Sequence, residues 1–282
     1  MSTPQLAIAA AVAGIGSFAY YKIQNNAAAT AAKKGKPIFS SFGFNTLKLH
    51  STELINHNTK KLRFELPDAT QPSGLALSSA LLTVSFPKGR WLPVLRPYTP
   101  TNDLAEPGFI ELMVKLYPGG KQSSHIHSLK PGDYLTFAPI PELKWTPNQH
   151  NHVAMIAGGA GITPMYQLAR GILKNPEDKT RITLVWGVNT DSDLFLKDEF
   201  DTLEKKYPGR FKTVYVVATP DAGSPYPKGF VTKQILEGAG LSPSEKNKDT
   251  KVVVCGPPPM EKALKGSVLT ELGYQKNQIF SF

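Results

Sequence analysis

The chain has 282 residues, 41% of them hydrophobic, so it is long enough for two domains of ordinary size and is not expected to be disordered. Its single cysteine excludes an internal disulfide and an iron–sulfur cluster held by four thiolates. The net charge is +10, and five lysines that precede the first acidic residue, Glu53, account for half of that excess. The remaining charge either forms a basic face for an acidic partner or is an ordinary lysine-rich surface. No interleaved basic and aromatic surface is visible, so a nucleic-acid-binding protein is not expected.

Residues 6–21 form an apolar run that is slightly shorter than the roughly 20 residues of a membrane-spanning helix. Tyr20, Tyr21 and Lys22 end the run with residue types that favour a membrane interface. We therefore predict a membrane anchor and linker at residues 1–36, with a cleaved presequence or a buried helix as alternatives. Lysines follow the run and none precedes it, so the positive-inside rule predicts that the rest of the chain lies in the cytosol.

Residues 39–137 contain short apolar runs separated by turns rich in proline and glycine, a pattern typical of antiparallel β structure. Strands are expected at residues 44–50, 62–66, 81–86, 91–96, 109–117 and 134–137. They indicate an antiparallel β-barrel, and we assign residues 37–140 to this domain. Gly119 and Gly120 lead into a short helix expected at residues 123–129. Such glycines leave backbone amides free for a phosphate, although a hairpin turn would explain them as well.

Residues 138–152 form an irregular connection, after which buried strands alternate with helices. Strands are expected at residues 153–157, 181–187, 213–218 and 251–254, and helices at residues 164–173, 194–207, 232–237 and 261–272. The alternation predicts a parallel sheet in an α/β domain, assigned to residues 141–282. Residues 278–282 are expected to form a final strand, with a frayed tail as the alternative. Ligands of such sheets bind at the carboxyl ends of the strands.

Three motifs follow predicted strands. The first is Arg96-Pro97-Tyr98-Thr99-Pro100, whose guanidinium suits a phosphate and whose ring suits a flat ligand. Alone, this motif fits an ordinary strand end equally well. The second is the turn Gly158-Gly159-Ala160-Gly161, which is followed by Ile162-Thr163-Pro164 at a helix start. The third is Cys255-Gly256-Pro257-Pro258-Pro259-Met260.

In this order the motifs resemble the ferredoxin reductase-like flavoproteins, and most of all the NADH-cytochrome b5 reductase family in its membrane-anchored fungal mitochondrial form. The resemblance covers roughly residues 40–282. It implies that the barrel domain binds FAD and the α/β domain binds NADH. Hydride would pass from the nicotinamide C4 to the flavin N5, and single electrons would then pass to cytochrome b5 or a similar small haem protein. The cofactors carry this chemistry, and the protein supplies position and electrostatics.

The resemblance also implies roles for individual residues. Thr99 would lie near the flavin edge, Cys255 would flank the nicotinamide, and Lys115 would contact the bound cofactors; these are the predicted catalytic residues. For Lys115 the alternative is an outward-pointing strand lysine, and Cys255 is expected to shape the pocket without a covalent role. The predicted cofactor-binding residues are Arg96, Pro97, Tyr98, Thr99, Met113, Lys115, Gly119, Gly120, Lys121, Gln122, Ser123, Gly158, Gly159, Ala160, Gly161, Thr163, Pro164, Asn189, Asp221, Cys255, Gly256, Pro257, Met260 and Phe282.

The sequence departs from related patterns at several positions. Pro164 occupies the last position of the usual G-x-G-x-x-G run, which argues against an ordinary Rossmann dehydrogenase. Residues 78–80 and 138–139 differ from the Gly-Gln-His and Gly-Pro sequences common in the family. Alignment offers Ala218 where an acidic residue would select NADH, so the candidates are Asp221 and, nearby, Asp191 and Asp193. No arginine cluster follows residues 181–187 to hold a 2′-phosphate, and we therefore expect NADH in preference to NADPH.

Two rival functions fit the same fold. One is an NAD(P)H reductase with a quinone or another acceptor. The other is a membrane-tethered nucleotide-binding protein without turnover, which predicts damage to Arg96, Tyr98 or the glycine turn, and all of these are intact. The resemblance favours the mitochondrial outer membrane, with the endoplasmic reticulum membrane or a processed intermembrane-space form as alternatives. A monomer is expected.

The six histidines are not expected to have a role in the chemistry. His125 and His127 form an H-x-H pair without a visible third ligand, so no metal site is predicted. The other four are expected in loops or at the surface, and they are His50, His57, His150 and His152.

Overall fold

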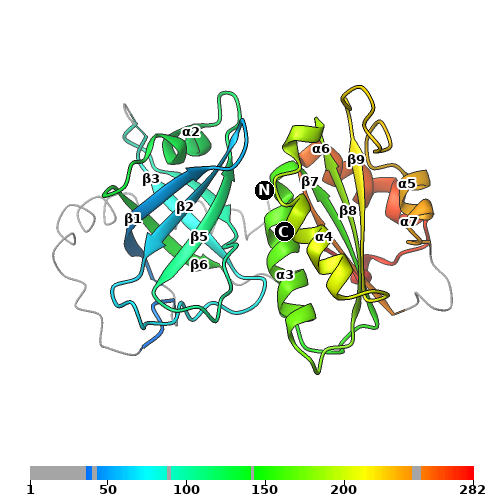
Figure 1. Cartoon of the computed structure of the whole chain (residues 1–282), viewed down its shortest axis with the longest axis horizontal. Coiled ribbons are helices and arrows are strands. Elements are labelled where there is room, and N and C mark those ends of the chain that lie inside the picture. Colours follow the sequence, from blue (N-terminus) through cyan, green and yellow to red (C-terminus); the bar gives the residue numbers. More distant parts are fainter. Residues whose placement is uncertain (1–35, 40–42, 88–89, 141–142, 243–248) are drawn as a thin grey trace, which may run out of the picture.

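A computed structural model describes residues 36–39, 43–87, 90–140, 143–242 and 249–282. They form an antiparallel β-sheet, which curves round on itself, beside a parallel sheet covered by helices on both faces (Figure 1). The anchor predicted at residues 6–21 lies outside the described residues. Within the described ranges, no helix is both long and apolar enough to cross a membrane.

The antiparallel half contains the six predicted strands, in the order β4-β3-β6-β1-β2-β5. The strands are β1 (Asn45–Leu54), β2 (Thr59–Glu65), β3 (Ala80–Ser85), β4 (Val94–Tyr98), β5 (Phe109–Lys115) and β6 (Tyr134–Ile140). Side chains alternate along a strand, so Leu62 and Phe64 both point inward and are fully buried. Phe64 meets Phe137 edge to face, with ring centroids 5.0 Å apart. Helix α2 (Lys121–Ser128) covers one end of this core (Figure 1).

The two end strands of the barrel sheet are not paired with each other. Strands β4 and β5 are the two ends of the sheet order, and the segment after β4 joins them. Thr101 donates its amide to the Glu111 carbonyl at 2.8 Å, and the Glu111 amide donates to Asn102 Oδ1 at 2.9 Å. The strand expected at residues 91–96 begins only at Val94, and Trp91 is 85% exposed outside it.

The second half is a five-stranded sheet in the order β11-β10-β7-β8-β9, and every pairing in it is parallel. Its strands are β7 (His152–Gly158), β8 (Arg181–Val188), β9 (Phe211–Val217), β10 (Thr250–Cys255) and β11 (Ile279–Ser281). Every residue of β7 is buried, as expected for a central parallel strand with both faces covered. The predicted parallel sheet and its final strand are therefore confirmed.

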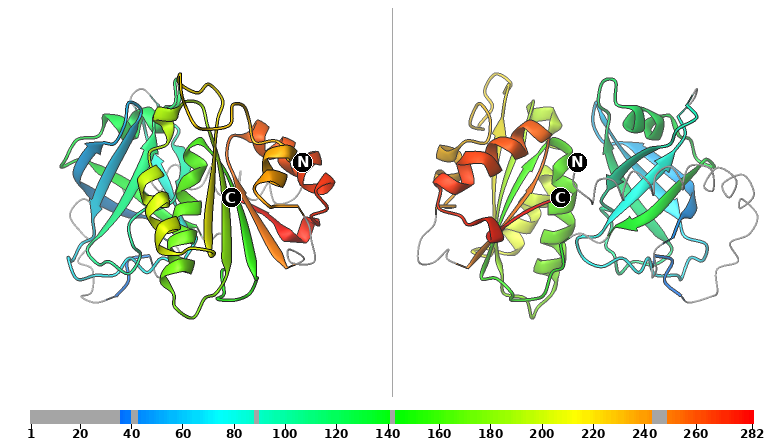
Figure 2. Two further views of the ribbon diagram at one scale, coloured as in Figure 1. Left: turned by 45° about the vertical axis from the view of Figure 1, so that its right-hand side comes forward. Right: turned by 180° about the vertical axis from the view of Figure 1, so that it is seen from behind.

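Helices cover the two faces of this sheet. On the face toward the barrel, α3 (Ile162–Lys174) and α4 (Lys197–Lys206) pack on Met155, Leu184 and Trp186. On the other face, α5 (Lys233–Gly238), α6 (Pro258–Ala263) and α7 (Leu269–Glu271) lie away from the barrel, and Ala154 and Ile156 belong to the core there (Figure 2). The alternation along β7 thus divides its side chains between two cores.

Two predicted helices differ from the structure at their ends. The helix expected at residues 194–207 begins at Lys197, because Asp191–Asp193 form a separate 3-10 turn, η2. The helix expected at residues 261–272 begins at Pro258, which favours the first turn of a helix, and contains a π-helical segment at Leu264–Val268.

The position of His152 differs from the one predicted from the sequence. It was expected in a loop or at the surface, but it lies in β7 and is only 2% exposed. Its Nε2 lies 3.0 Å from Thr183 Oγ1 and its Nδ1 lies 3.2 Å from Thr250 Oγ1. These threonines come from the strands on either side, so the local sequence gives no sign of this site.

The pH dependence of stability tests the burial of His152. Burial, reinforced by the charge of Arg181, lowers the pKa of His152 to about 4, below the ordinary value of 6.5. The native state therefore holds a neutral ring, and the associated stability is complete above pH 6.5 and is lost as the pH falls toward 4. We predict that the wild-type protein loses about 2–3 kcal/mol more than His152→Gln between pH 7.5 and 4.5, measured by urea unfolding. Equal losses in the two proteins would contradict the assignment.

Candidate functional site

A cavity of about 720 Å³ lies between the two halves of the molecule. Its walls come from β4, β5 and the start of α2 on one side, and from the loops after β7 and β10 on the other. The sequence-predicted site residues line this cavity except for four, namely Gly159, Asn189, Asp221 and Met260. The structure therefore brings together motifs that are far apart in the chain, while their binding roles stay predictions.

The end of β4 presents a cation and a neutral aromatic ring to the cavity. Arg96 and Tyr98 lie two residues apart on the strand and both reach the cavity wall. Arg96 is exposed, and its guanidinium donates to the Leu95 carbonyl at 2.7 Å. Burial raises the pKa of the Tyr98 phenol to about 12, and the charge of Arg96 offsets this only in part. Tyr98 therefore stays neutral and offers a flat, polarisable surface beside a fixed positive charge.

The start of α2 is held by side chains that bond back to the barrel. Gln122 donates its amide to Thr83 Oγ1 at 2.8 Å, and Ser85 donates its hydroxyl to Gln122 Oε1 at 2.6 Å. Gln122 lines the cavity, and its predicted role in cofactor binding stays a prediction; the polar atoms of its side chain bond to β3. Gly120 provides the N-cap without a capping side chain, so the first-turn amides and Lys121 face the cavity as a site for an anion.

Glycines at the end of β7 allow a close approach to the end of β10. A Cβ on Gly161 would lie 2.2 Å from the Cys255 carbonyl oxygen, and a Cβ on Gly158 would lie 2.5 Å from Met260 Sδ. Met260 was predicted in the site, and it packs against Gly158 from outside the cavity wall. Gly159 has a φ of +52°, which glycine adopts without strain, and its carbonyl accepts from Trp186 Nε1 at 3.0 Å.

Asn189 and Asp221 lie at the carboxyl ends of β8 and β9 but outside the cavity. Both are exposed, and the Asn189 carbonyl accepts the amide of Thr219 at 2.8 Å. Asp191, an alternative candidate, accepts from the Asp221 amide at 2.9 Å and from Ser224 Oγ at 2.6 Å. These contacts shape the loops beside the cavity.

Tyr117 is a cavity residue that the sequence analysis did not include. It follows β5, lines the cavity and places its hydroxyl 3.5 Å from the position of a Cβ on Gly159. Burial raises the pKa of its phenol, and a hydrogen bond from the Ala160 backbone partly offsets the effect. Tyr117 therefore joins the barrel to the glycine turn. The only sequence signal was its position two residues after Lys115.

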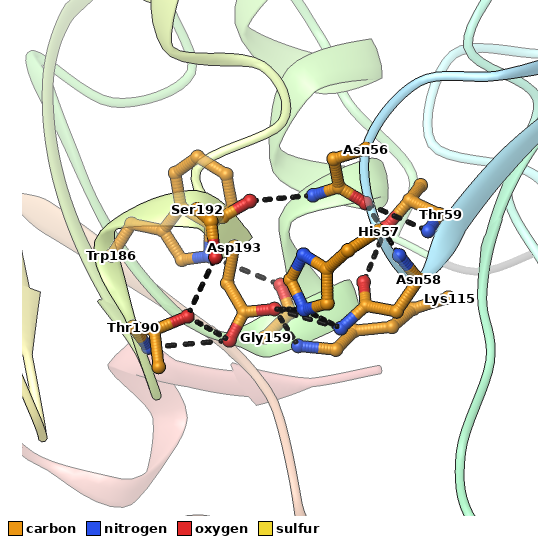
Figure 3. Close-up of polar contacts among 10 residues, drawn as sticks. All are labelled: Asn56, His57, Asn58, Thr59, Lys115, Gly159, Trp186, Thr190, Ser192 and Asp193. Atoms are coloured by element: carbon orange, nitrogen blue, oxygen red, sulfur yellow. Dashed lines mark hydrogen bonds and ion pairs between the residues drawn. The ribbon is translucent and has the colours of Figure 1, made fainter.

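Lys115 points inward, contrary to the surface alternative. It is 7% exposed, lines the cavity and donates to Asp193 Oδ1 at 2.7 Å (Figure 3). Burial raises the pKa of the Asp193 carboxyl. Hydrogen bonds from Lys115 and Asn58, together with the charge of Lys115, outweigh this effect, so the pKa lies below its ordinary value.

Comparison with known proteins identifies the class of each half. Residues 46–145 match the family described as Oxidoreductase FAD-binding domain, and residues 155–266 match the Oxidoreductase NAD-binding domain. These two matches show that the chain is an oxidoreductase of the class that binds FAD and a nicotinamide dinucleotide.

Within the described residues there is no group of three or more His, Cys, Asp or Glu side chains that could hold a metal ion.

Individual relatives narrow this class. The chain is 45% identical to NADH-cytochrome b5 reductase 2 of Emericella nidulans, over 98% of the chain and 89% of the relative. It is 50% identical to the protein of the same name from Botryotinia fuckeliana, over 85% and 72%. The cytochrome b5 reductase domain of Ulva prolifera nitrate reductase matches with a TM-score of 0.78 and 31% identity, over 85% of the chain and 97% of the domain. The chain belongs to the NADH-cytochrome b5 reductase family.

The geometry of the cavity fits the two cofactors. Its volume lies in the range of small-molecule sites, and the cationic Arg96 and Lys121 lie on the side formed by the FAD-matched residues. The glycine turn and the start of α3 lie on the side formed by the NAD-matched residues, where a helix start and small residues accommodate a pyrophosphate. Both sides open into one space, which allows the reactive ends of two bound cofactors to meet.

We predict that Arg96→Ala weakens FAD retention. Loss of a charge-assisted phosphate contact would cost roughly 1.5–3 kcal/mol, or about a 10- to 150-fold rise in the FAD dissociation constant. Arg96→Lys, which keeps the charge but not the planar fork, should fall between the variant and the wild type. The measurement is flavin absorbance per protein after dilution and gel filtration. Full occupancy in Arg96→Ala would show that Arg96 does not hold the cofactor.

Proposed function

We propose that the protein takes a hydride from NADH onto FAD and passes electrons singly to cytochrome b5 or a similar small haem protein. One observation carries the proposal: a single cavity receives walls from both cofactor-binding halves. The relatives that match nearly the whole chain carry the name NADH-cytochrome b5 reductase 2, and this supports the choice of donor and acceptor. Bound FAD supplies the conversion from a two-electron to a one-electron transfer.

The barrel residues bind and orient FAD in this proposal. Arg96, Lys121 and the first-turn amides of α2 neutralise its phosphates, and Tyr98 packs against the flavin ring. Thr99, which is 7% exposed at the end of β4, provides a hydroxyl beside the flavin edge. The network of Gln122, Thr83 and Ser85 holds α2 in register with β3, so these groups are aligned before the cofactor binds.

The α/β residues position the dinucleotide. The glycine turn and the start of α3 face its pyrophosphate, while Thr163 and Cys255 flank the nicotinamide. Phe282 closes the cavity from the C-terminus, and its amide donates to the Val254 carbonyl at 3.1 Å. Lys115 contributes the cation that meets the bound cofactors. No acid or base chemistry is required of any of these side chains.

NADH is the proposed donor in preference to NADPH. In the described part of the loops after β8 and β9, residues 189–193 and 218–224 contain no arginine or lysine that would pair with a 2′-phosphate. Asp191 and Asp221 add negative charge near these loops, which disfavours the additional phosphate of NADPH.

Location and assembly are further proposals. We place the protein at the mitochondrial outer membrane, held by residues 6–21, with its catalytic halves in the cytosol. Support comes from the apolar run, from the lysines that follow it and from the resemblance to the anchored fungal form. The catalytic part is proposed to act as a monomer that meets its haem partner transiently.

An acceptor series tests the proposed function. The chain lacking residues 1–36, reduced with one equivalent of NADH, is mixed in a stopped-flow instrument with oxidised cytochrome b5, a quinone or buffer. We predict that cytochrome b5 reoxidises the flavin at least ten times faster than the quinone. We also expect the rate to fall as salt is raised, because the proposed encounter joins a basic face of this chain to an acidic haem edge of the partner. A faster reaction with the quinone would favour the rival reductase.

A further inference from the structure

Asp193 is a buried carboxylate outside the cavity wall, and it receives donors from both halves of the molecule. It lies at the end of η2, is 3% exposed, and its carboxylate is contacted by four residues (Figure 3). From its own half, the Thr190 amide and hydroxyl lie 3.2 and 3.3 Å from Oδ2. From the barrel, Lys115 Nζ and Asn58 Nδ2 donate to Oδ1 at 2.7 and 2.9 Å, and His57 Nε2 lies 3.6 Å from it.

The barrel turn that reaches Asp193 is itself rigid. Asn56 Oδ1 accepts the amides of Asn58 and Thr59 at 3.1 and 2.7 Å, which fixes the turn between β1 and β2. Asn56 Nδ2 then donates to the Ser192 carbonyl at 2.7 Å. The η2 turn is thus fastened to the barrel by one backbone contact and by the contacts to Asp193. Lys115 is the one of these donors that also lines the cavity.

The pair of Lys115 and Asp193 differs from the other ion pairs. It is the only one among the described residues in which both side chains are less than a tenth exposed, at 8% and 4%. A lysine ammonium is a compact charge on a flexible stem, and its removal from water needs a compensating partner. The Asp193 carboxylate provides that partner and, because Thr190 fixes Oδ2, holds Oδ1 at one defined place. The direction of the Lys115 side chain is therefore set from the nucleotide-binding half.

We propose that Asp193 is a positioning residue for the reductase reaction, which fixes Lys115 at the wall of the shared cavity and thereby sets the affinity for the nicotinamide dinucleotide. This inference rests on the proposed function. Asp193 acts only through Lys115 and touches neither cofactor. Its loss should weaken dinucleotide binding, while FAD should stay bound because Arg96, Lys121 and the first-turn amides of α2, which are proposed to hold its phosphates, do not contact Asp193.

The other contacts between the halves provide a control. Near the outer end of α3, Gln167 Nε2 donates to the Pro100 carbonyl at 3.0 Å, and Arg170 donates to the Thr101 carbonyl at 2.8 Å. Lys174 pairs with Asp103 there, and its side chain is 67% exposed. Lys174→Ala therefore removes an ion pair between the same two halves without touching the cavity.

The test is a double-mutant comparison of Asp193→Asn, Lys115→Met, both together, and Lys174→Ala. Each protein carries FAD and is mixed anaerobically with increasing NADH, and the flavin absorbance gives an apparent Kd and a limiting rate. Calorimetry with NAD⁺ gives a second affinity that needs no turnover.

We expect Asp193→Asn to raise both dissociation constants at least tenfold and to change the limiting rate less than threefold. When Lys115 is already replaced by methionine, Asp193→Asn should raise the two dissociation constants by less than a third of the factor seen with Lys115 present. Lys174→Ala should match the wild type within twofold.

Labelling adds a readout that is independent of activity. Lys115 is shielded in the wild type, so an amine-acylating reagent should modify it slowly, and at least fivefold faster in Asp193→Asn, as measured by peptide mass spectrometry. If Asp193→Asn does not fold, Asp193→Glu replaces it. That variant moves the carboxylate by one methylene and should raise the NADH Kd at least threefold, again only when Lys115 is present.

Two results would overturn the inference. The first is a Kd of Asp193→Asn for NADH that stays within tenfold of the wild type. The second is a rise in Kd that is of similar size with and without Lys115, which would indicate a purely structural role for Asp193. A wild-type flavin that NADH does not bleach would instead overturn the proposed function, and this inference with it. A wild type that is bleached, with either of the first two results, removes the role of Asp193 alone.

Discussion

The close packing of the glycine turn after β7 on the end of β10 is the constraint on which the site depends. The strands β7 and β10 are neighbours in the sheet, and the turn after β7 packs directly on the end of β10 because Gly161 has no side chain. A Cβ there would lie 2.2 Å from the Cys255 carbonyl oxygen, and a Cβ on Gly158 would lie 2.5 Å from Met260 Sδ. This packing creates one compact wall; Tyr117 reaches it from the barrel, with its hydroxyl 3.5 Å from the position of a Cβ on Gly159, and Lys115 lines the same cavity. A cofactor bound to the barrel and a cofactor bound at the carboxyl edge of the sheet therefore share one cavity.

The polar contacts that join the halves have unequal roles. Exposed pairs such as Lys174 and Asp103 are expected to contribute little, because water and salt screen them. The buried pair of Lys115 and Asp193 requires full pairing of both charges, and removal of one partner would leave the other buried and unpaired. Loss of one partner is therefore expected to disturb the buried pair, which includes the cavity residue Lys115, more than the exposed pair.

Local patterns in the sequence predicted most of the fold. The continuous apolar run at β7 indicated a buried strand, and the short apolar runs between turns rich in proline and glycine indicated the barrel strands. The motif residues were found because each lies at a strand end or helix start with recognisable chemistry. The anchor predicted at residues 6–21 stays a prediction.

The features that were missed depend on contacts between distant residues. His152 is buried because Thr183 and Thr250 are its neighbours across β8 and β10. Asp193 is held by Lys115, which is 78 residues away in sequence. In each case a polar side chain looks like a surface residue or a ligand until its partner is known.

The most direct test of the central claim is an absorbance spectrum of the purified chain lacking residues 1–36, followed by an anaerobic NADH titration and addition of oxidised cytochrome b5. The account predicts an oxidised flavin spectrum that NADH bleaches with a one-to-one endpoint, and a return of the flavin absorbance as cytochrome b5 becomes reduced. A colourless protein that does not take up added FAD would contradict it and would leave a nucleotide-binding protein without turnover as the better description.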